Sequence, residues 1–303
     1  GNVKGLRCRI LADMGAYLRL VSPGVPVLGA FMFNGIYKFQ AYRFECDGIF
    51  TNKTPTDAYR GAGRPEATFA VERIMDELAV ELGMDPLELR RRNWIRAEEF
   101  PFTSVAGMTY DSGDYHRTLD VALEKIGYQA LLTEQAEKRA RGELMGIGFS
   151  TFTEVVGAGP SKHFDILGIK MFDSAELRVH PTGKAVLKIG VQSQGQGHET
   201  TFAQIVAGEL GIPAEDVEVH HGDTDHTPYG LGTYGSRSTP VSGGAVALAA
   251  RKVQEKARLI AAAMLETRPE DLEWEKGRWY VKGDPGMGKT IAEIALGAHG
   301  TVA

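Results

Sequence analysis

The fold class that the sequence predicts mixes α-helices with β-strands in two successive parts. The chain has 303 residues, which is enough for two domains, or one large one, with a sizeable core. Hydrophobic residues make up 43% and charged residues 24% of the chain, as in an ordinary globular protein. Apolar residues recur at every second position in some segments and at helical spacing in others, and the alternation starts again in the second half.

In the first half, strands precede helices. Leu6, Cys8 and Ile10 alternate as in a strand, and residues 43–51 form the next one. Helical spacing then predicts a helix over residues 65–82, whose methionine and aromatic side chains are expected in the core. Three further helices are predicted over residues 87–94, 114–126 and 129–141. The basic end of the last helix and Gly142 form the predicted linker, which divides the chain into parts 1–141 and 142–303.

In the second half, strands and helices alternate again. Helices are predicted over residues 199–210 and 241–265. Ser238 or Thr239 is the expected N-cap of the second of these, because Pro240 suits a first helical position. Strands are predicted over residues 146–153, 175–180, 184–191 and 217–220, and a hairpin between Trp274 and Trp279.

Charge and cysteine content argue against several functions. The formal net charge of −5 disfavours a mainly electrostatic binder of nucleic acid or anionic membranes. No apolar run reaches the roughly 18 residues of a spanning helix. Cys8 and Cys46 are too few for a disulfide framework or a thiolate-held metal, so a reducing, cytoplasmic location is expected. Because the chain opens on Gly1 without a methionine, we expect an internal piece of a longer protein.

Glycine is unusually frequent, with 37 residues in the chain. Because glycine is costly unless a positive φ or a close backbone approach requires it, clustered glycines predict tight loops that meet a ligand. The most informative loop is QSQGQGH at residues 192–198, between a strand and a helix. Its N–H groups and the helix N-terminus can bind an anion, and its neutral amides suit a polar ligand. An ordinary tight turn is the alternative.

Two other loops lead into helices in the same way. TYGSRST at residues 233–239 combines hydroxyls, a glycine and Arg237, whose guanidinium can bind two oxygens of a phosphate or pyrophosphate. AYRGAGRP at residues 58–65 places small residues between two arginines, so the backbone can approach a ligand whose charge the arginines fix. Taken singly, each loop is also explained as a helix entry with a solvated arginine.

Four motifs follow one another along the chain: DAYRGAGRPE at residues 57–66, FSTFTEVVGAGP at 149–160, SQGQGH at 193–198 and YGLGTYGSRST at 229–239. Together they resemble the molybdenum-binding large subunits of the xanthine oxidase family, which includes the aerobic carbon monoxide dehydrogenases. The resemblance implies an α+β pair of molybdopterin-binding domains with mixed sheets. Residues 1–141 would be the C-terminal part of the first domain with linker helices, and residues 142–303 the N-terminal part of the second.

The resemblance also implies a cofactor, molybdenum on a pterin dithiolene in the form of molybdopterin cytosine dinucleotide, with no side chain of this chain bound to the metal. Gln196 would hydrogen-bond a molybdenum oxygen, and Arg60 would lie beside the metal. Phe152 and Glu154 lie in a segment that resembles the wall of the substrate pocket; for Phe152 a place in the core is the alternative. The other implied cofactor-binding residues are Gly61, Ala62, Gln194, Gly195, Gly197, His198, Gly235, Ser236, Arg237, Ser238 and Thr239.

Implied partners are a small subunit with a 2Fe-2S cluster and a medium subunit with FAD, in a heterotrimer. Two departures from the family pattern bear on activity. Carbon monoxide dehydrogenases have a copper-binding cysteine where this chain has Gly61, which offers copper no soft ligand. The family's general-base glutamate is expected C-terminal to this chain, which would therefore be inactive alone.

The resemblance thus implies that the whole subunit hydroxylates an aldehyde or an N-heterocycle with oxygen derived from water. Oxidation of carbon monoxide is the first alternative, and a non-catalytic module that binds an anionic ligand is the second.

Two further motifs have simpler explanations. GDPGMGKT at residues 283–290 matches the phosphate-binding pattern G-x-x-x-x-G-K-T, but too few residues follow for a nucleotide hydrolase. A hairpin exit and a helix start are expected there instead. A cluster near residue 220 resembles a metal site, but adjacent strand residues point to opposite faces, so a solvated strand end is expected. The cluster consists of His220, His221, Asp223, Asp225 and His226.

Overall fold

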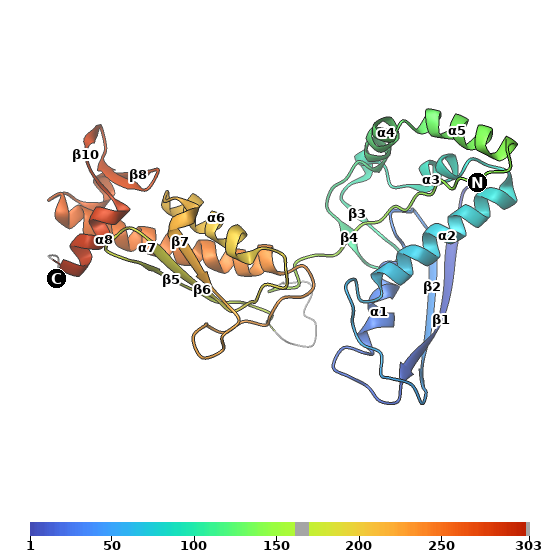
Figure 1. Ribbon diagram of the computed structural model, residues 1–303, viewed down its shortest axis with the longest axis horizontal. Helices are drawn as coiled ribbons and strands as arrows, with labels where there is room; N and C mark the ends of the chain where they lie inside the picture. The colour runs from blue at the N-terminus through green and yellow to red at the C-terminus, as the bar shows by residue number, and fades with distance from the viewer. Residues whose placement is uncertain (161–169, 301–303) are drawn as a thin grey trace. The chain divides into compact units, whose positions relative to one another are not determined.

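The computed structural model describes residues 1–160 and 170–300, which form two compact units, Gly1–Glu154 and Val155–Ala303 (Figure 1). Each unit combines helices with small sheets, which confirms the predicted mixture of the two. Segment 142–154, which follows the predicted linker, belongs to the first compact unit. No helix in the described part of the chain is long and apolar enough to cross a membrane.

The first unit contains a two-stranded parallel sheet at its N-terminal end. Strands β1 (Gly5–Gly15) and β2 (Ala41–Phe50) pair in register, and α1 (Gly24–Ala30) lies between them in the sequence. Both predicted strands are therefore confirmed. The remaining elements are α2 (Arg64–Leu82), α3 (Pro86–Asn93), the 3-10 turn η1 (Ala97–Glu99), the short hairpin β3 (Phe102–Thr103) and β4 (Thr109–Tyr110), α4 (Tyr115–Ile126) and α5 (Tyr128–Ala140).

Helix α2 confirms the predicted helix over residues 65–82. Val71, Met75 and Ala79 are buried at helical spacing, as the pattern predicts for the face toward the core. Phe69 is 70% exposed, so the expectation that it lies in the core is wrong for this unit. Asp85 caps the next helix, because its side chain accepts from the backbone N–H groups of Leu87 and Glu88.

The second unit is built on a three-stranded sheet in the order β5 (Ala175–Val179), β6 (Ala185–Ile189), β7 (Val217–His220). Strands β5 and β6 are antiparallel, and β6 and β7 are parallel. The crossover between the parallel strands contains α6 (His198–Leu210) and the 3-10 turn η2 (Ala214–Asp216), as parallel pairing requires. Helix α7 (Gly243–Met264) lies beside α6 (Figure 1). The two helices contribute to a core that includes Leu187, Ile189, Phe202, Val206 and Val246.

A second small sheet follows α7 and the 3-10 turn η4 (Pro269–Asp271). It has the order β10 (Asp284–Thr290), β9 (Arg278–Val281), β8 (Leu272–Glu275), and it leads into α8 (Ile291–Gly300). Trp274 and Trp279 face each other across the β8–β9 hairpin, which confirms its prediction. The G-x-x-x-x-G-K-T motif forms strand β10, in which Lys289 pairs with Trp279. An extended backbone that is paired with a neighbouring strand does not wrap around a phosphate. The expected alternative, a hairpin that leads into the start of a helix, is therefore confirmed by the β9–β10 pair and by α8.

Two local predictions are wrong. Residues 146–153 form no strand, and the backbone N–H of Thr151 donates instead to the side chain of Glu72. The start of the long helix is not the predicted Ser or Thr cap followed by proline: Ser238–Ser242 form a π-helical turn (η3), and α7 begins at Gly243 with no side-chain cap. The turn places Ser242 inside the unit, where its hydroxyl donates to Asp173.

Candidate cofactor site

Two glycine-rich loops of the second unit leave the same edge of its sheet. Because β6 and β7 are parallel, the segments that follow them, residues 190–197 and 221–237, both start at the carboxyl edge. The Thr233 hydroxyl donates to the carbonyl oxygen of Gln192 at 2.5 Å. Gly190 and Gly230 lie back to back, since a Cβ on Gly230 would stand 2.1 Å from the Gly190 oxygen. The structure therefore brings together two of the three predicted loops.

The loop before α6 presents open backbone. Gly195 and Gly197 have φ values of +99° and +75°, which favour glycine. A Cβ at either position would meet no atom of the described residues within 4 Å, so the glycines leave room above the loop. Gln194 and Gln196 are exposed, and the Gln194 N–H donates to Oε1 of Gln196. These exposed amides, with a helix N-terminus that no side chain caps, fit a polar or anionic ligand.

His198, the first residue of α6, carries an unsatisfied polar atom. It is 3% exposed, and its Nδ1 has no hydrogen-bond partner in the described part of the chain. Its ring lies against those of Phe202 and His221, at centroid distances of 5.1 and 6.5 Å. Buried polar nitrogens are usually paired, so an unpartnered one beside an open glycine loop fits a site that takes a polar ligand group.

Acid is expected to destabilise the second unit through His198. Burial, followed by the charge of His221, lowers the pKa of His198 from its usual 6.5. The unfolded chain then binds the proton more readily than the folded chain, so this penalty is absent well above pH 6.5, grows as the pH falls from 6.5 to the lowered pKa, and is constant below it. His198→Phe should reduce the loss of stability between about pH 7 and about pH 5, measured by urea denaturation. If His198→Phe loses as much stability over this pH range as His299→Phe, a control at an exposed histidine, the assignment of the effect to His198 is contradicted.

The loop before α7 is organised by Arg237, which points inward. Its guanidinium is fully buried and donates to Asp173 Oδ2 at 2.7 Å, and to the carbonyl oxygens of Ala158, Gly232 and Met171 at 2.9, 3.0 and 2.8 Å. Four of its five N–H donors are thus engaged within the unit. The expectation that this guanidinium binds two phosphate oxygens is wrong, because its N–H donors are already bonded to Asp173 and to backbone carbonyl oxygens that hold the loop.

The other predicted residues of this loop remain at the surface. Gly235 and Ser236 have φ values of +58° and +52°, and Ser236 and Thr239 are exposed. Ser238 is half-buried at the start of the π-helical turn. Arg237 therefore supports a loop whose backbone and hydroxyls, not its charge, face the outside.

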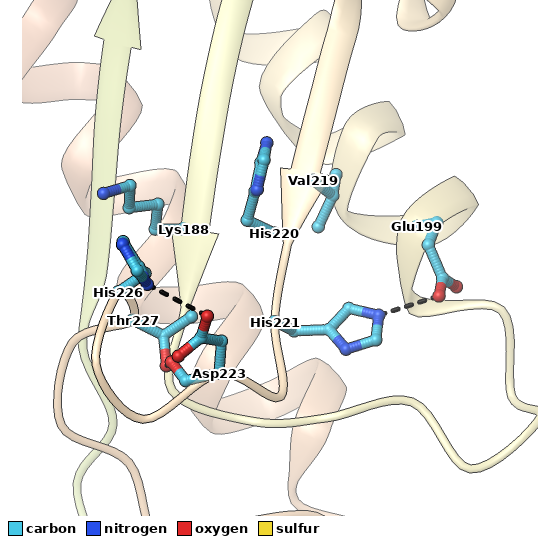
Figure 2. A pocket seen from close by; sticks show the side chains of 8 residues that line it. All are labelled: Lys188, Glu199, Val219, His220, His221, Asp223, His226 and Thr227. Atoms are coloured by element: carbon cyan, nitrogen blue, oxygen red, sulfur yellow. Dashed lines mark hydrogen bonds and ion pairs between the residues drawn. The ribbon is translucent and has the colours of Figure 1, made fainter.

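An open hollow of about 500 Å³ lies beside this edge, between the end of β7 and the start of α6 (Figure 2). Figure 2 shows His221 turned toward Glu199, whereas His220 points to another side of β7. His221 and Glu199 lie 2.7 Å apart, and His226 and Asp223 2.9 Å. Among the residues that the structure describes, no three His, Cys, Asp or Glu side chains are arranged to hold a metal ion. The hollow is lined by Lys188, Glu199, Val219, His220, His221, Asp223, His226 and Thr227.

The third predicted loop, residues 58–65, belongs to the first unit. Arg60 is exposed, and Gly61, Ala62 and Gly63 have φ values of +102°, +47° and +92°. A Cβ on Gly61 would stand 2.4 Å from the ring of Pro65, so the loop has no space for a side chain there. Cys8 and Cys46 lie in strands β1 and β2, not in this loop. The loop therefore lacks a thiol, and its conformation also excludes one at residue 61.

The predicted wall segment of the substrate pocket lies at this loop. Arg64, which donates to the Gly61 oxygen, also forms an ion pair of 2.5 Å with Glu154. Phe152 is 66% exposed, so the alternative that places it in the core is wrong for this unit. The structure thus brings Glu154 to the loop that carries Arg60.

Two buried carboxylates of the described residues, Asp173 and Glu72, were not predicted from the sequence. Asp173 neutralises Arg237, and Glu72 on α2 accepts hydrogen bonds from Arg90 and Thr151. A signal for Glu72 was available, because it lies at helical spacing on the same face as Met75 and Ala79, and a carboxylate on a core face needs partners. No sequence signal links Asp173 to Arg237.

Paired glycine loops at the carboxyl edge of parallel strands, each leading into a helix, are typical of a domain that binds a large polar cofactor. The chain belongs to the molybdopterin cofactor-binding domain family, whose two domain types match residues 1–94 and 121–302. This confirms the resemblance to the molybdenum-binding domains of the xanthine oxidase family and the α+β class.

Three relatives illustrate the similarity. The carbon monoxide dehydrogenase large chain of Hydrogenophaga pseudoflava is 52% identical over 99% of this chain. A crystal structure of a Cu,Mo-CO dehydrogenase in its carbon monoxide reduced state has a TM-score of 0.86 at 47% identity, over 99% of this chain and 39% of that one. Quinoline 2-oxidoreductase from Pseudomonas putida 86 also has a TM-score of 0.86, at 39% identity, over 98% of this chain and 38% of that one. The chain spans only 38% of the length of the Hydrogenophaga relative.

Proposed function

We propose that this chain is the cofactor-binding part of the large subunit of a molybdenum hydroxylase that oxidises an aldehyde or an aromatic N-heterocycle with oxygen from water. Family membership supplies the molybdopterin cofactor. The observation that carries the choice of reaction is Gly61: a Cβ there would overlap Pro65, so the loop beside Arg60 offers no thiolate for copper.

In this proposal the loops of the second unit hold the cofactor by backbone and neutral side chains. Gln194, Gly195, Gly197 and His198 surround the pterin, and the Nδ1 atom of His198 finds its partner there. Gln196 would hydrogen-bond the molybdenum end of the cofactor through its neutral amide. Gly235, Ser236, Ser238 and Thr239 hold the phosphate end of a cytosine dinucleotide with N–H and hydroxyl donors, while Arg237 keeps their loop in shape from inside. Similarity to carbon monoxide dehydrogenase supports the dinucleotide form.

When bound, the cofactor supplies the two-electron oxidation of the substrate carbon. In the first unit, Arg60, Gly61 and Ala62 are the proposed cofactor-binding residues. The exposed guanidinium of Arg60 would stabilise negative charge, and the backbone at Gly61 and Ala62 allows close approach. Phe152 presents an exposed apolar ring to an aromatic substrate, and Glu154 is fixed by Arg64. The base that removes a proton belongs to a segment C-terminal to this chain.

The same proposal includes the rest of the assembly. Residues 1–141 and 142–303 belong to the first and second molybdopterin-binding domains of the large subunit. That subunit works in the cytoplasm with a small subunit carrying a 2Fe-2S cluster and a medium subunit carrying FAD, which pass the electrons on. Similarity to a carbon monoxide dehydrogenase large chain supports a multi-subunit enzyme.

Oxidation of carbon monoxide is the second candidate, favoured by the 52% identity to the Hydrogenophaga large chain. The two candidates differ in what they require at residue 61. A copper site needs a soft ligand in this loop, whereas hydroxylation of an organic substrate needs room for a ring or an aldehyde.

The test compares both reactions in the purified complex that contains the full-length subunit. We expect one molybdenum and one pterin per large subunit, and reduction of an electron-accepting dye with benzaldehyde or quinoline. Carbon monoxide should give no turnover with or without added copper. Rapid oxidation of carbon monoxide would overturn the hydroxylase assignment, and absence of molybdenum and pterin would leave only an anion-binding module.

A further inference from the structure

We propose that Glu72 and Thr151 form a clamp that positions the predicted wall of the substrate pocket, residues 152–154, against the helix that begins at the Arg60 loop. The clamp makes Thr151 and Glu72 positioning residues, which act through Phe152 and Glu154. This inference rests on the proposed function, because it assigns a task within the same site.

The carboxylate of Glu72 is buried and fully used. It is 4% exposed, and each of its two oxygens accepts one hydrogen bond from the core and one from Thr151. Oε1 accepts from the Tyr37 hydroxyl at 2.5 Å and from the Thr151 hydroxyl at 3.0 Å. Oε2 accepts from Arg90 Nε at 3.0 Å and from the Thr151 backbone N–H at 3.1 Å. Glu72 therefore binds Thr151 through both its backbone N–H and its side-chain hydroxyl.

The core partners alone would satisfy the buried charge. Arg90 is fully buried and pairs with Glu72 and with Asp76, and its Nη2 also donates to the carbonyl oxygen of Glu72. Burial, followed by the charge of Glu72, raises the pKa of Tyr37, so its hydroxyl stays a donor. A carboxylate has about four acceptor positions, and Thr151 takes the two that Arg90 and Tyr37 leave. The bonds from Thr151 thus fix a segment that has no secondary structure of its own.

A second attachment holds the same segment to the same helix. Three residues after Thr151, Glu154 pairs with Arg64 at the first turn of α2. Arg64 and Glu72 are eight residues apart, which is about 12 Å along a helix, and three residues of extended chain reach about 10 Å. The segment therefore lies along α2, attached at both ends, and the exposed ring of Phe152 lies between the attachments.

Two variants that remove one hydrogen bond each from the same oxygen of Glu72 separate positioning from mere stability. Thr151→Val removes the hydroxyl donor on the segment, and Tyr37→Phe removes the hydroxyl donor on the core side. Thr151→Ser keeps the donor and should rescue the effect of the valine. All three are made in the purified complex with the full-length subunit, and molybdenum content is measured to show that the cofactor is loaded.

For Thr151→Val we expect the backbone amide of residue 151, whose N–H donates to Glu72 Oε2, to exchange with deuterium about tenfold faster, as the loss of the neighbouring hydroxyl hydrogen bond allows. The KM for quinoline or benzaldehyde should rise about three- to tenfold with kcat changed less than twofold. Tyr37→Phe and Thr151→Ser should leave both quantities within twofold of the unchanged enzyme.

The outcomes are distinguishable. Equal effects of Thr151→Val and Tyr37→Phe on KM would overturn the positioning role, and so would unchanged exchange in Thr151→Val. If the unchanged enzyme carries molybdenum but oxidises neither substrate, the proposed function fails, while deuterium exchange still shows whether the clamp holds the segment.

Discussion

Replacing Asp173 by alanine is expected to lower the free energy of unfolding of the second unit by about 3–5 kcal/mol, because it leaves a buried guanidinium without its counter-charge. The side chains of Asp173 and Arg237 are both fully buried, and Asp173 also accepts from the Ser242 hydroxyl and the Leu231 N–H. Native-state deuterium exchange of strand β6, in the core of this unit, measures the loss.

The loss should extend to the cofactor loop, because Arg237 holds that loop through the carbonyl oxygens of Ala158 and Gly232. We therefore expect molybdenum and pterin content to fall together with stability. The control is Glu255→Ala, which removes an exposed ion pair with Arg258 on α7 and should leave both measurements unchanged. Unaltered exchange in Asp173→Ala would show that Arg237 does not organise the loop.

Replacing Gly63 by alanine is the second change with a large expected effect. The residue has a φ of +92°, and a Cβ there would stand 1.9 Å from the Val25 carbonyl oxygen and 3.0 Å from the Gly29 nitrogen. The strained backbone alone costs about 1–3 kcal/mol, and α1 must also move away. We expect the free energy of unfolding of the first unit to fall by more than this backbone cost, as measured by thermal unfolding. We also expect Arg60 to be displaced.

Gly83, at the other end of the same helix, provides a matched control. It also has a positive φ, +61°, but a Cβ there would meet no described atom within 4 Å. Gly83→Ala should therefore cost only the backbone term, about 1–2 kcal/mol. Equal losses of unfolding free energy in Gly63→Ala and Gly83→Ala would show that the close approach of the loop to α1 does not restrict residue 63.

The parts of the fold that the sequence predicted are those with a strong local period. Helix α2 and strand β6 follow from spacing alone, because the faces they bury are regular. Residues 146–153 show the limit, since they alternate like a strand, but the backbone N–H of Thr151 is bonded to a side chain of α2 and not to a neighbouring strand. Which partner a segment finds depends on tertiary contacts that a periodic pattern does not contain.

In the candidate site, too, local sequence predicts some features, and tertiary contacts decide the others. Each glycine loop was predictable from its composition, but that two of them meet follows from the parallel pairing of β6 with β7, which no motif specifies. Arg237 was predicted to face a phosphate because its neighbours are hydroxyls and glycine. Its inward direction is set by Asp173, 64 residues earlier in the chain, and by carbonyl oxygens that a sequence pattern does not reveal.

The central claim is that the enzyme containing this chain adds oxygen from water to an organic substrate and does not oxidise carbon monoxide. The most direct test is mass spectrometry of the product that the purified complex forms from quinoline or benzaldehyde in water enriched in oxygen-18. We predict a hydroxylated or carboxylate product that carries at least one heavy oxygen from the solvent. An unlabelled product, or carbon monoxide consumed faster than either compound, would contradict the account.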